Sequence, residues 1–158
     1  MADQRVGLGF DVHPSDPSRA LRLGGVPFEG EPGLAGRSDA DVVCHALADA
    51  LLGAAALGDL GRHFPEDDPA TEGMAGLDLL SRATALVVEA GYRPASCDVT
   101  VVADRPAVGP RAPDMARALA PALGLEPDRV SVKATRPEGL GLSGDGIGCL
   151  AVVMIRTP

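Results

Sequence analysis

The sequence predicts one α/β or α+β domain, arranged as a sandwich with a mixed β-sheet and helices on one face. Segments with strand patterns and segments with helix patterns are mixed along the chain, which is typical of a sheet covered by helices. The 158 residues suit one domain with a real core, and no internal repeat or low-complexity linker divides them. We therefore expect residues 1–158 to form a single domain.

Short apolar segments near the start predict the first strands. Residues 5–10 are expected as a strand that enters a turn at residues 11–14. Residues 21–28 are expected as a second strand or a hairpin with a Gly-Gly bend. A loop containing Gly and Pro follows over residues 30–36.

The strongest helix signal covers residues 39–57, and Gly58 follows it. Ser38, with Asp41 three residues on, resembles a capping box in which Asp replaces the usual Glu. An apolar stripe recurs at helical spacing: Val42, Ala46, Leu47, Ala50 and Leu51.

The rest of the chain alternates between loops, helices and strands. We expect an acidic loop over residues 63–73, a helix over 74–90, a strand over 97–103, a Pro-rich connection over 104–113, a helix over 114–123, a strand over 129–135, a Gly-rich loop over 137–148 and a strand over 149–155.

The composition limits both the core and the partners. Apolar residues make up 46% of the chain but aromatic residues only 3%, so the core must be built from Ala, Leu and Val. Because such side chains bury little area each, association into an oligomer would be a natural source of stability. The net charge of −8 argues against a nucleic-acid partner, which needs excess Lys and Arg. An acidic protein that binds a phosphorylated ligand must gather its cations locally or use metals.

The cysteines and the first residues indicate a cytoplasmic protein. Three cysteines, at positions 44, 97 and 149, are an odd number without a Cys-x-x-Cys motif, so we expect buried thiols rather than disulfides. The N-terminus lacks a signal-peptide pattern, and the apolar runs are far too short to span a bilayer. We therefore expect no membrane association.

Asp11, His13 and His45 form a candidate metal site. Asp11 and His13 are two residues apart, so in extended backbone both side chains point to one face. His45 would join them from the long helix. Two imidazoles and one carboxylate are a catalytic zinc set with one position open. Asp41 or Asp49, each one turn from His45, could accept the second ring N–H of that histidine.

Simpler interpretations stay open for these residues. An Asp-x-His pair is a weak signal on its own, since Asp11 could cap a turn and His13 could lie in a surface loop. The helix carboxylates could be solvated charges. On composition alone, the metal site is one interpretation among several.

Donors around the strand over residues 129–135 could hold a phosphate. Lys133, Thr135, Arg136 and Glu138 lie at its end, and Glu138 could hold Mg²⁺. A polar strand end with a surface ion pair is an equal alternative. The following glycines could bring backbone N–H groups to an anion or could form a tight turn. Ser38 at a helix N-terminus could favour an anion or act as a simple cap. No Gly-x-Ser-x-Gly or Walker motif is present.

Together these motifs resemble one known family. The matching segments are Gly9-Phe10-Asp11-Val12-His13, Ser38-Asp39-Ala40-Asp41-Val42, the helix from His45 to Asp59, Phe64-Pro65 and Lys133-Ala134-Thr135. In these residues the chain resembles the 2-C-methyl-D-erythritol 2,4-cyclodiphosphate synthase family, from about Arg5 to Ile155.

The resemblance implies a homotrimer with active sites between subunits, and a cytidine-diphosphate substrate. It implies cyclisation of 4-diphosphocytidyl-2-C-methyl-D-erythritol 2-phosphate with release of CMP, a step of the non-mevalonate isoprenoid pathway. It also implies Zn²⁺, or another divalent transition metal, on Asp11, His13 and His45. A second ion, Mg²⁺ or Mn²⁺, would bridge the phosphates and meet Glu138.

The resemblance also assigns the other site residues. The catalytic group comprises Ser38, Asp49, Thr135 and Glu138. The substrate-binding group comprises Arg37, Asp59, Gly61, Phe64, Asp68, Ala103, Pro106, Lys133, Ala134 and Arg136, with Ala103, Pro106, Ala134 and Thr135 around the cytidine.

The chain departs from the family pattern at several phosphate and substrate contacts. Arg37 stands where the family has His, and Arg136-Pro137 stands where it has two threonines. Ala107 replaces a Lys, and Asp145 and Ile147 replace an Arg and a Glu. The arginines could restore cationic contacts or mark a different substrate. Two alternatives therefore stay open: a diverged zinc-dependent homologue for another cytidine-diphosphate substrate, and a non-catalytic trimeric metal- or nucleotide-binding protein.

Overall fold

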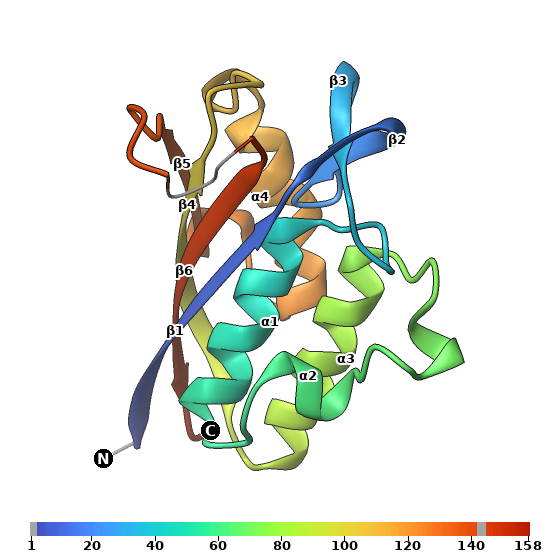
Figure 1. The fold of residues 1–158 in the computed structure, drawn as a ribbon. Coiled ribbons are helices and arrows are strands. Elements are labelled where there is room, and N and C mark those ends of the chain that lie inside the picture. Colours follow the sequence, from blue (N-terminus) through green and yellow to red (C-terminus); the bar gives the residue numbers. More distant parts are fainter. Residues whose placement is uncertain (1–2, 142–144) are drawn as a thin grey trace.

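A mixed sheet with a helical layer on one face forms the body of the molecule (Figure 1). The computed structural model describes residues 3–141 and 145–158. The strand order is β1 (Gln4–His13), β6 (Ile147–Arg156), β4 (Arg93–Val102) and β5 (Val130–Thr135). The first two pairs are antiparallel and β4–β5 is parallel, so a helix must cross over between those last two strands.

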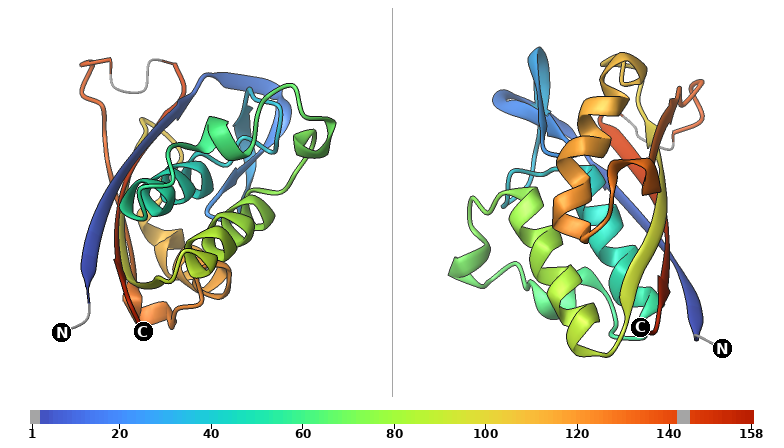
Figure 2. Two further views of the ribbon diagram at one scale, coloured as in Figure 1. Left: turned by 90° about the horizontal axis from the view of Figure 1, so that it is seen from below. Right: turned by 180° about the vertical axis from the view of Figure 1, so that it is seen from behind.

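The helical layer consists of α1 (Val42–Ala54), α3 (Gly76–Glu89) and the crossover helix α4 (Ala112–Leu123). All three lie on the same side of the sheet, which confirms the expected α+β arrangement (Figure 2). Shorter helices complete the list: α2 (Leu60–His63), and the 3₁₀ turns η1 (Pro69–Thr71), η2 (Gly109–Arg111) and η3 (Pro127–Arg129). In the described part of the chain, no helix is both long and apolar enough to cross a membrane.

A separate hairpin, β2 (Ser15–Leu23) and β3 (Val26–Leu34), extends beyond the end of the main sheet (Figure 1). Gly24 and Gly25 form its turn with φ of 58° and 76°, a conformation that glycine adopts without steric cost. The sequence predicted this bend, but the hairpin is longer than residues 21–28. Its second strand includes most of the expected loop, because that segment pairs with β2 as far as Leu34.

Close contact between β1 and α1 depends on two glycines. A Cβ atom added to Gly7 would lie 1.9 Å from the Ala50 carbonyl oxygen, and one added to Gly9 would lie 1.9 Å from that of Ala46. Only hydrogen at these positions lets the helix backbone pack directly on the strand. Gly7 and Gly9 share a face of β1 with residues 11 and 13, so this close approach brings α1 up to the candidate metal ligands.

Small apolar side chains fill the space between sheet and helices, as the composition predicted. The largest fully buried ones include Leu47, Leu51, Leu80, Leu119 and Ile155. The three cysteines are buried free thiols, as expected. Burial raises the pKa of Cys97 to about 12, so this thiol stays protonated at neutral pH.

The opposite face of the sheet carries an exposed apolar strip across β1 and β6. Its exposed members are Val6, Leu8, Phe10 and Val12 on β1, and Leu150 and Val152 on β6. The β1–β6 register places Leu8 beside Val152 and Phe10 beside Leu150, so the strip is continuous. Leu8 is 65% exposed and Phe10 is 48% exposed. An exposed apolar surface of this kind marks an interaction site.

Some expected boundaries were wrong for local physical reasons. Strand β1 continues to His13, over most of the expected turn at residues 11–14, because Asp11 and His13 pair with β6. The helix α1 begins at Val42 rather than residue 39, since its N-cap is Asp41 and not Ser38. Helix α4 begins before residue 114, with Pro113 in its first turn, where the missing N–H costs nothing.

Candidate metal centre

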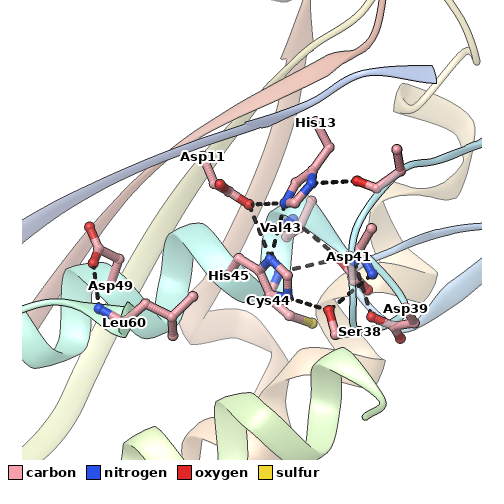
Figure 3. A network of polar contacts seen from close by, with 12 residues as sticks. Asp11, His13, Ser38, Asp39, Asp41, Val43, Cys44, His45, Asp49 and Leu60 are labelled. Atoms are coloured by element: carbon pink, nitrogen blue, oxygen red, sulfur yellow. Dashed lines mark hydrogen bonds and ion pairs between the residues drawn. The ribbon is translucent and has the colours of Figure 1, made fainter. Parts of the chain in front are cut away.

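Three side chains converge between the end of β1 and the first turn of α1 (Figure 3). Asp11 Oδ2 lies 2.9 Å from His13 Nε2 and 3.1 Å from His45 Nδ1. The two ring nitrogens are 3.3 Å apart. Ligand atoms of a tetrahedral zinc ion with bonds of about 2.0–2.1 Å are about 3.3 Å apart, so the spacing suits a single ion.

The backbone positions the three ligands through simple periodicity. Asp11 and His13 lie two residues apart on β1, and both point toward α1. His45 is on the first turn of α1 and is buried. The prediction that these residues lie together is therefore confirmed.

The hydrogen bonds of His13 leave one ring nitrogen available to a cation. His13 Nδ1 lies 2.7 Å from the Ala35 carbonyl oxygen, which can only accept, so Nδ1 carries the proton. In a neutral imidazole Nε2 then carries a lone pair, which faces the lone pairs of Asp11 Oδ2. Two acceptors 2.9 Å apart require a proton or a metal ion between them. The donor set thus fits a divalent metal ion on chemical grounds.

Ser38, rather than a helix carboxylate, contacts the second nitrogen of His45. Ser38 Oγ lies 3.0 Å from His45 Nε2 and accepts a hydrogen bond from the Ala40 N–H. The expectation that Asp41 or Asp49 would contact His45 was wrong. Asp49 lies farther along α1, where its Oδ1 accepts from the Leu60 N–H and ties α2 to α1.

Asp41 is instead a fully buried N-cap. Its carboxylate accepts from the backbone N–H groups of Val43 and Cys44 at the start of α1. It also accepts from Gly24 and Gly25 at the tip of the β2–β3 hairpin. Burial raises the pKa of Asp41, although these hydrogen bonds oppose the shift. Asp41 therefore fixes the first turn of α1, which carries His45, against the hairpin.

Opposite charges at the site shift the pKa values of Asp11 and His13. Burial acts to raise the pKa of Asp11, but hydrogen bonds and charge interactions with His13 and His45 outweigh it and hold that pKa well below its usual range. The hydrogen bond to Asp11 is the main reason why the pKa of His13 is raised. The carboxylate is therefore ionised at neutral pH, as a metal ligand must be.

We expect the metal-free protein to lose stability as pH rises above about 6.5. The folded-state pKa of His13 is raised from 6.5, so its pairing with Asp11 stabilises fully below 6.5 and is lost as pH rises through the raised value. Urea unfolding at about pH 6 and about pH 8.5 would measure the decline. In His13→Gln the decline should be smaller, and an equal decline in both proteins would contradict this origin.

The ligands line one side of a cavity of about 240 Å³. Four other residues expected from the sequence also line this cavity: Arg37, Ser38, Gly61 and Phe64. Its lining also contains residues that sequence reasoning missed: Gly36, Leu60, Glu66, Thr71 and Leu79. The sequence carried no signal for these residues; the structure shows that Gly36 leaves room for His13, since a Cβ there would lie 3.2 Å from its ring.

Arg19 is a further residue that the sequence did not single out. Its guanidinium donates to the carbonyl groups of Gly36 and Ser38. These two bonds hold the loop that carries Arg37 and Ser38 into the cavity. The Arg37 side chain is itself only loosely paired, with Nη2 4.0 Å from Glu72 Oε2, so it is free to meet a ligand.

A second group of expected residues lies elsewhere. Ala134 and Thr135 end β5 beside Val101 and Val102 of β4, and the Ala103 N–H bonds to the Thr135 carbonyl. The remaining members follow these strand ends or lie on β5: Pro106, Lys133, Arg136 and Glu138. Because β6 separates β4 from β1, this group lies about 10 Å or more from the metal ligands along the sheet. Within one chain the two groups do not form a single cavity among the described residues.

Two expected substrate contacts cap helices instead of lining the cavity. Asp59 is the N-cap of α2 and accepts from the Arg62 N–H, and Asp68 is the N-cap of η1 and accepts from the Ala70 N–H. Lys133 pairs with Asp98 on the neighbouring strand. Whether any of these residues also contacts a substrate stays a prediction.

Fold and site together define a class: an α+β protein with a candidate metal site of two histidines and one carboxylate beside a cavity. The sequence model of the YgbB family matches residues 4–156. A 2-C-methyl-D-erythritol 2,4-cyclodiphosphate synthase from Symbiobacterium thermophilum is 54% identical over 152 residues, which cover 95% of this chain and 97% of that protein. The chain therefore belongs to the 2-C-methyl-D-erythritol 2,4-cyclodiphosphate synthase (YgbB) family.

Solved structures agree with this assignment. The bifunctional IspDF from Campylobacter jejuni superposes with a TM-score of 0.94 at 36% identity, covering 100% of this chain and 43% of that longer one. A 2C-methyl-D-erythritol-2,4-cyclodiphosphate synthase bound to CDP superposes with a TM-score of 0.87 at 34% identity. That match covers 96% of this chain and 99% of the other.

Proposed function

We propose that the chain converts 4-diphosphocytidyl-2-C-methyl-D-erythritol 2-phosphate to 2-C-methyl-D-erythritol 2,4-cyclodiphosphate and CMP. An oxygen of the 2-phosphate attacks the β-phosphorus, and the bond from that phosphorus to the bridging oxygen of CMP breaks. CMP leaves with the electron pair. The observation that carries the proposal is the convergence of Asp11, His13 and His45 beside a cavity, in a chain of this family.

The reaction needs positioning and charge neutralisation more than a protein nucleophile, because the attacking oxygen belongs to the substrate. A zinc ion held by Asp11, His13 and His45 would supply Lewis acidity at the β-phosphate. Glu138 would hold a second ion, Mg²⁺ or Mn²⁺, against the diphosphate. The neighbouring cationic side chain is Arg37, whose planar fork can grip phosphate oxygens in a bidentate way.

The remaining residues serve to orient the substrate in this proposal. Ser38 keeps His45 in place and presents its hydroxyl to the cavity. The residues at the ends of β4 and β5, among them Ala103, Pro106, Ala134 and Thr135, would surround the cytidine. Lys133, Arg136, Asp59, Asp68 and the catalytic role of Asp49 stay predictions of the sequence resemblance.

A homotrimer would unite the two groups of residues in one site. The metal ligands and the strand ends of β4 and β5 lie at the same end of the sheet, but among the described residues the cavity that the ligands line does not include the strand ends. A site between subunits removes that gap, because one chain can supply the metal and its neighbour the cytidine pocket. The exposed apolar strip on β1 and β6 supports such an assembly, since association would remove it from water.

Leu8→Glu should dissociate this assembly into single chains. A charge at the centre of the apolar strip would be buried in the interface without a partner. The free-energy cost of burying it would exceed the stabilisation from the rest of the contact. Sedimentation velocity would measure the number of chains. Val88→Glu, which alters an exposed valine on α3 away from the strip, is the matched control and should leave the assembly intact. An unchanged sedimentation coefficient for Leu8→Glu would exclude the strip as the interface.

Incubation with the cytidine substrate, Zn²⁺ and Mg²⁺ tests the reaction itself. Phosphorus NMR should show the two coupled resonances of a cyclic diphosphate appearing together with CMP. Absence of CMP under saturating conditions would reject the proposal. The same assay with Mn²⁺ or Co²⁺ in place of Zn²⁺ would establish which metal the site uses.

Arg37→Ala should lower kcat/KM by about 10–100-fold while metal content stays unchanged. The side chain lines the cavity and its ion pair is with Glu72 rather than with a metal ligand, so the main loss is its contact with substrate phosphate. Arg82→Ala, on the exposed face of α3, is the control and should leave kcat/KM as in the wild type. If both variants match the wild type, Arg37 does not bind the substrate.

One observation favours a second candidate, a homologue for another cytidine-diphosphate substrate. Arg37 enters the cavity where the family pattern has His, so the charge and reach of the substrate pocket differ. A panel of cytidine-diphosphate alcohols would decide between the two. Preferred turnover of the methylerythritol compound would reject this candidate.

A further inference from the structure

A second cavity, of about 680 Å³, lies at the end of the sheet opposite the metal centre. Gln4, the first residue of β1, and Arg156, the last residue of β6, are part of its lining. His13 is at the other end of β1, and ten residues at about 3.3 Å each make that strand about 30 Å long. The chain ends marked in Figure 1 show this region, which is far from the proposed reaction.

Three arginines line the cavity: Arg93, Arg129 and Arg156. Arg93 and Arg156 are direct partners in the antiparallel register of β4 and β6. Like charges placed opposite each other on neighbouring strands destabilise a sheet. Arg129 joins them from η3, immediately before β5. The fold therefore gathers cationic side chains where electrostatic repulsion opposes it.

Like Arg62 and Arg82, these arginines have no carboxylate partner in the described part of the chain, but these three are gathered around one cavity. Arg5, Arg105, Arg111 and Arg117 each form an ion pair with a carboxylate. Across residues 3–141 and 145–158, no ion pair within 4.0 Å involves Arg93, Arg129 or Arg156. The acidic side chain in the described lining is Glu126. Three exposed arginines and one acidic side chain thus line this cavity, in a chain whose net charge is −8.

The end of α4, which also lines the cavity, does not supply the missing partners. Its last carbonyl groups would attract cations, but the carbonyls of Ala120 and Pro121 already accept from the N–H groups of Leu125 and Gly124. Leu123, Leu125 and Met154 add apolar lining beside the arginines. The cavity therefore combines unpaired guanidinium groups with apolar walls.

We propose that this cavity binds a phosphate- or diphosphate-bearing anion, at a site separate from the metal centre. Guanidinium groups match phosphate oxygens with paired hydrogen bonds, and an anion between Arg93 and Arg156 would turn their repulsion into attraction. The apolar lining would receive an organic group carried by the phosphate.

Titration of metal-free full-length protein with inorganic diphosphate tests the proposal, because removing the metal takes away the main anion attraction of the other site. Isothermal calorimetry should detect binding to the wild type, and Arg129→Gln and Arg93→Gln should weaken the affinity at least about tenfold. Arg82→Gln changes an exposed arginine on α3 outside the lining and should leave the affinity unchanged.

Thermal unfolding distinguishes an anion-binding role of these arginines from a purely structural role. Without diphosphate, Arg156→Gln should raise the Tm, because it relieves the repulsion from Arg93; a purely structural arginine would lower it. Diphosphate should raise the Tm of the wild type more than that of Arg156→Gln. The proposal fails if the wild type does not bind diphosphate, or if the Arg93 and Arg129 variants bind it as tightly as the wild type.

Discussion

Asp11→Asn should lower turnover by roughly 10³-fold or more and remove the bound metal. The carboxylate is the anionic member of the ligand set, and its oxygen is within 3.1 Å of both ring nitrogens. An amide has the same shape but is a poor ligand for a divalent ion. Metal analysis and the CMP-release assay on one preparation would measure both effects.

At a pH above the raised pKa of His13, the metal-free Asp11→Asn protein should fold as well as the metal-free wild type. The amide N–H can donate to His13 Nε2, so the cavity keeps a hydrogen bond where the ion pair was. Asp67→Asn, on an exposed loop position after α2, is the control and should keep both metal and turnover. If Asp11→Asn retains metal and activity, the catalytic role of this site is wrong.

Gly9→Ala should destabilise the protein by about 3 kcal/mol or more and weaken metal binding as well. The new Cβ atom would lie 1.9 Å from the Ala46 carbonyl oxygen, and both are backbone-anchored, so strand and helix must move apart. This movement separates His45 on α1 from Asp11 and His13 on β1. Urea unfolding and zinc titration would measure the two effects.

Gly53→Ala is the matched control for this change. Gly53 lies within α1 and nothing would meet its Cβ within 4 Å, so alanine should stabilise the helix by about 0.5–1 kcal/mol. The same substitution thus has opposite expected signs at two glycines. A small effect at Gly9 would mean that β1 and α1 can separate without cost, and would contradict the packing described above.

Short-range geometry predicted that Asp11 and His13 share one face, whereas the family resemblance implied that His45 joins them. Asp11 and His13 share a strand face by two-residue periodicity, and His45 lies on a helix with a strong apolar stripe. The partners of those ligands could not be predicted in this way. Ala35, Ser38 and Arg19 reach the site through the β2–β3 hairpin and its following loop, and no local pattern reports a long-range contact of that kind.

The capping prediction failed for a related reason. Ser38 and Asp41 both suit the start of a helix, and local propensity does not choose between them. The choice depends on the hairpin tip, because Gly24 and Gly25 donate to Asp41 and fix it as the N-cap. Ser38 is then free to contact His45. Tertiary contacts therefore decided which of two plausible caps became a site residue.

The two faces of strand β1 have different roles. One side holds the ligands and the glycines against α1, and the other holds the apolar strip that we propose as the subunit contact. A slip of one residue in its pairing with β6 would exchange the sides, turning the ligands outward and the apolar side chains inward. Metal binding and subunit assembly would then be lost together. A change in this strand that shifts its register therefore affects both properties.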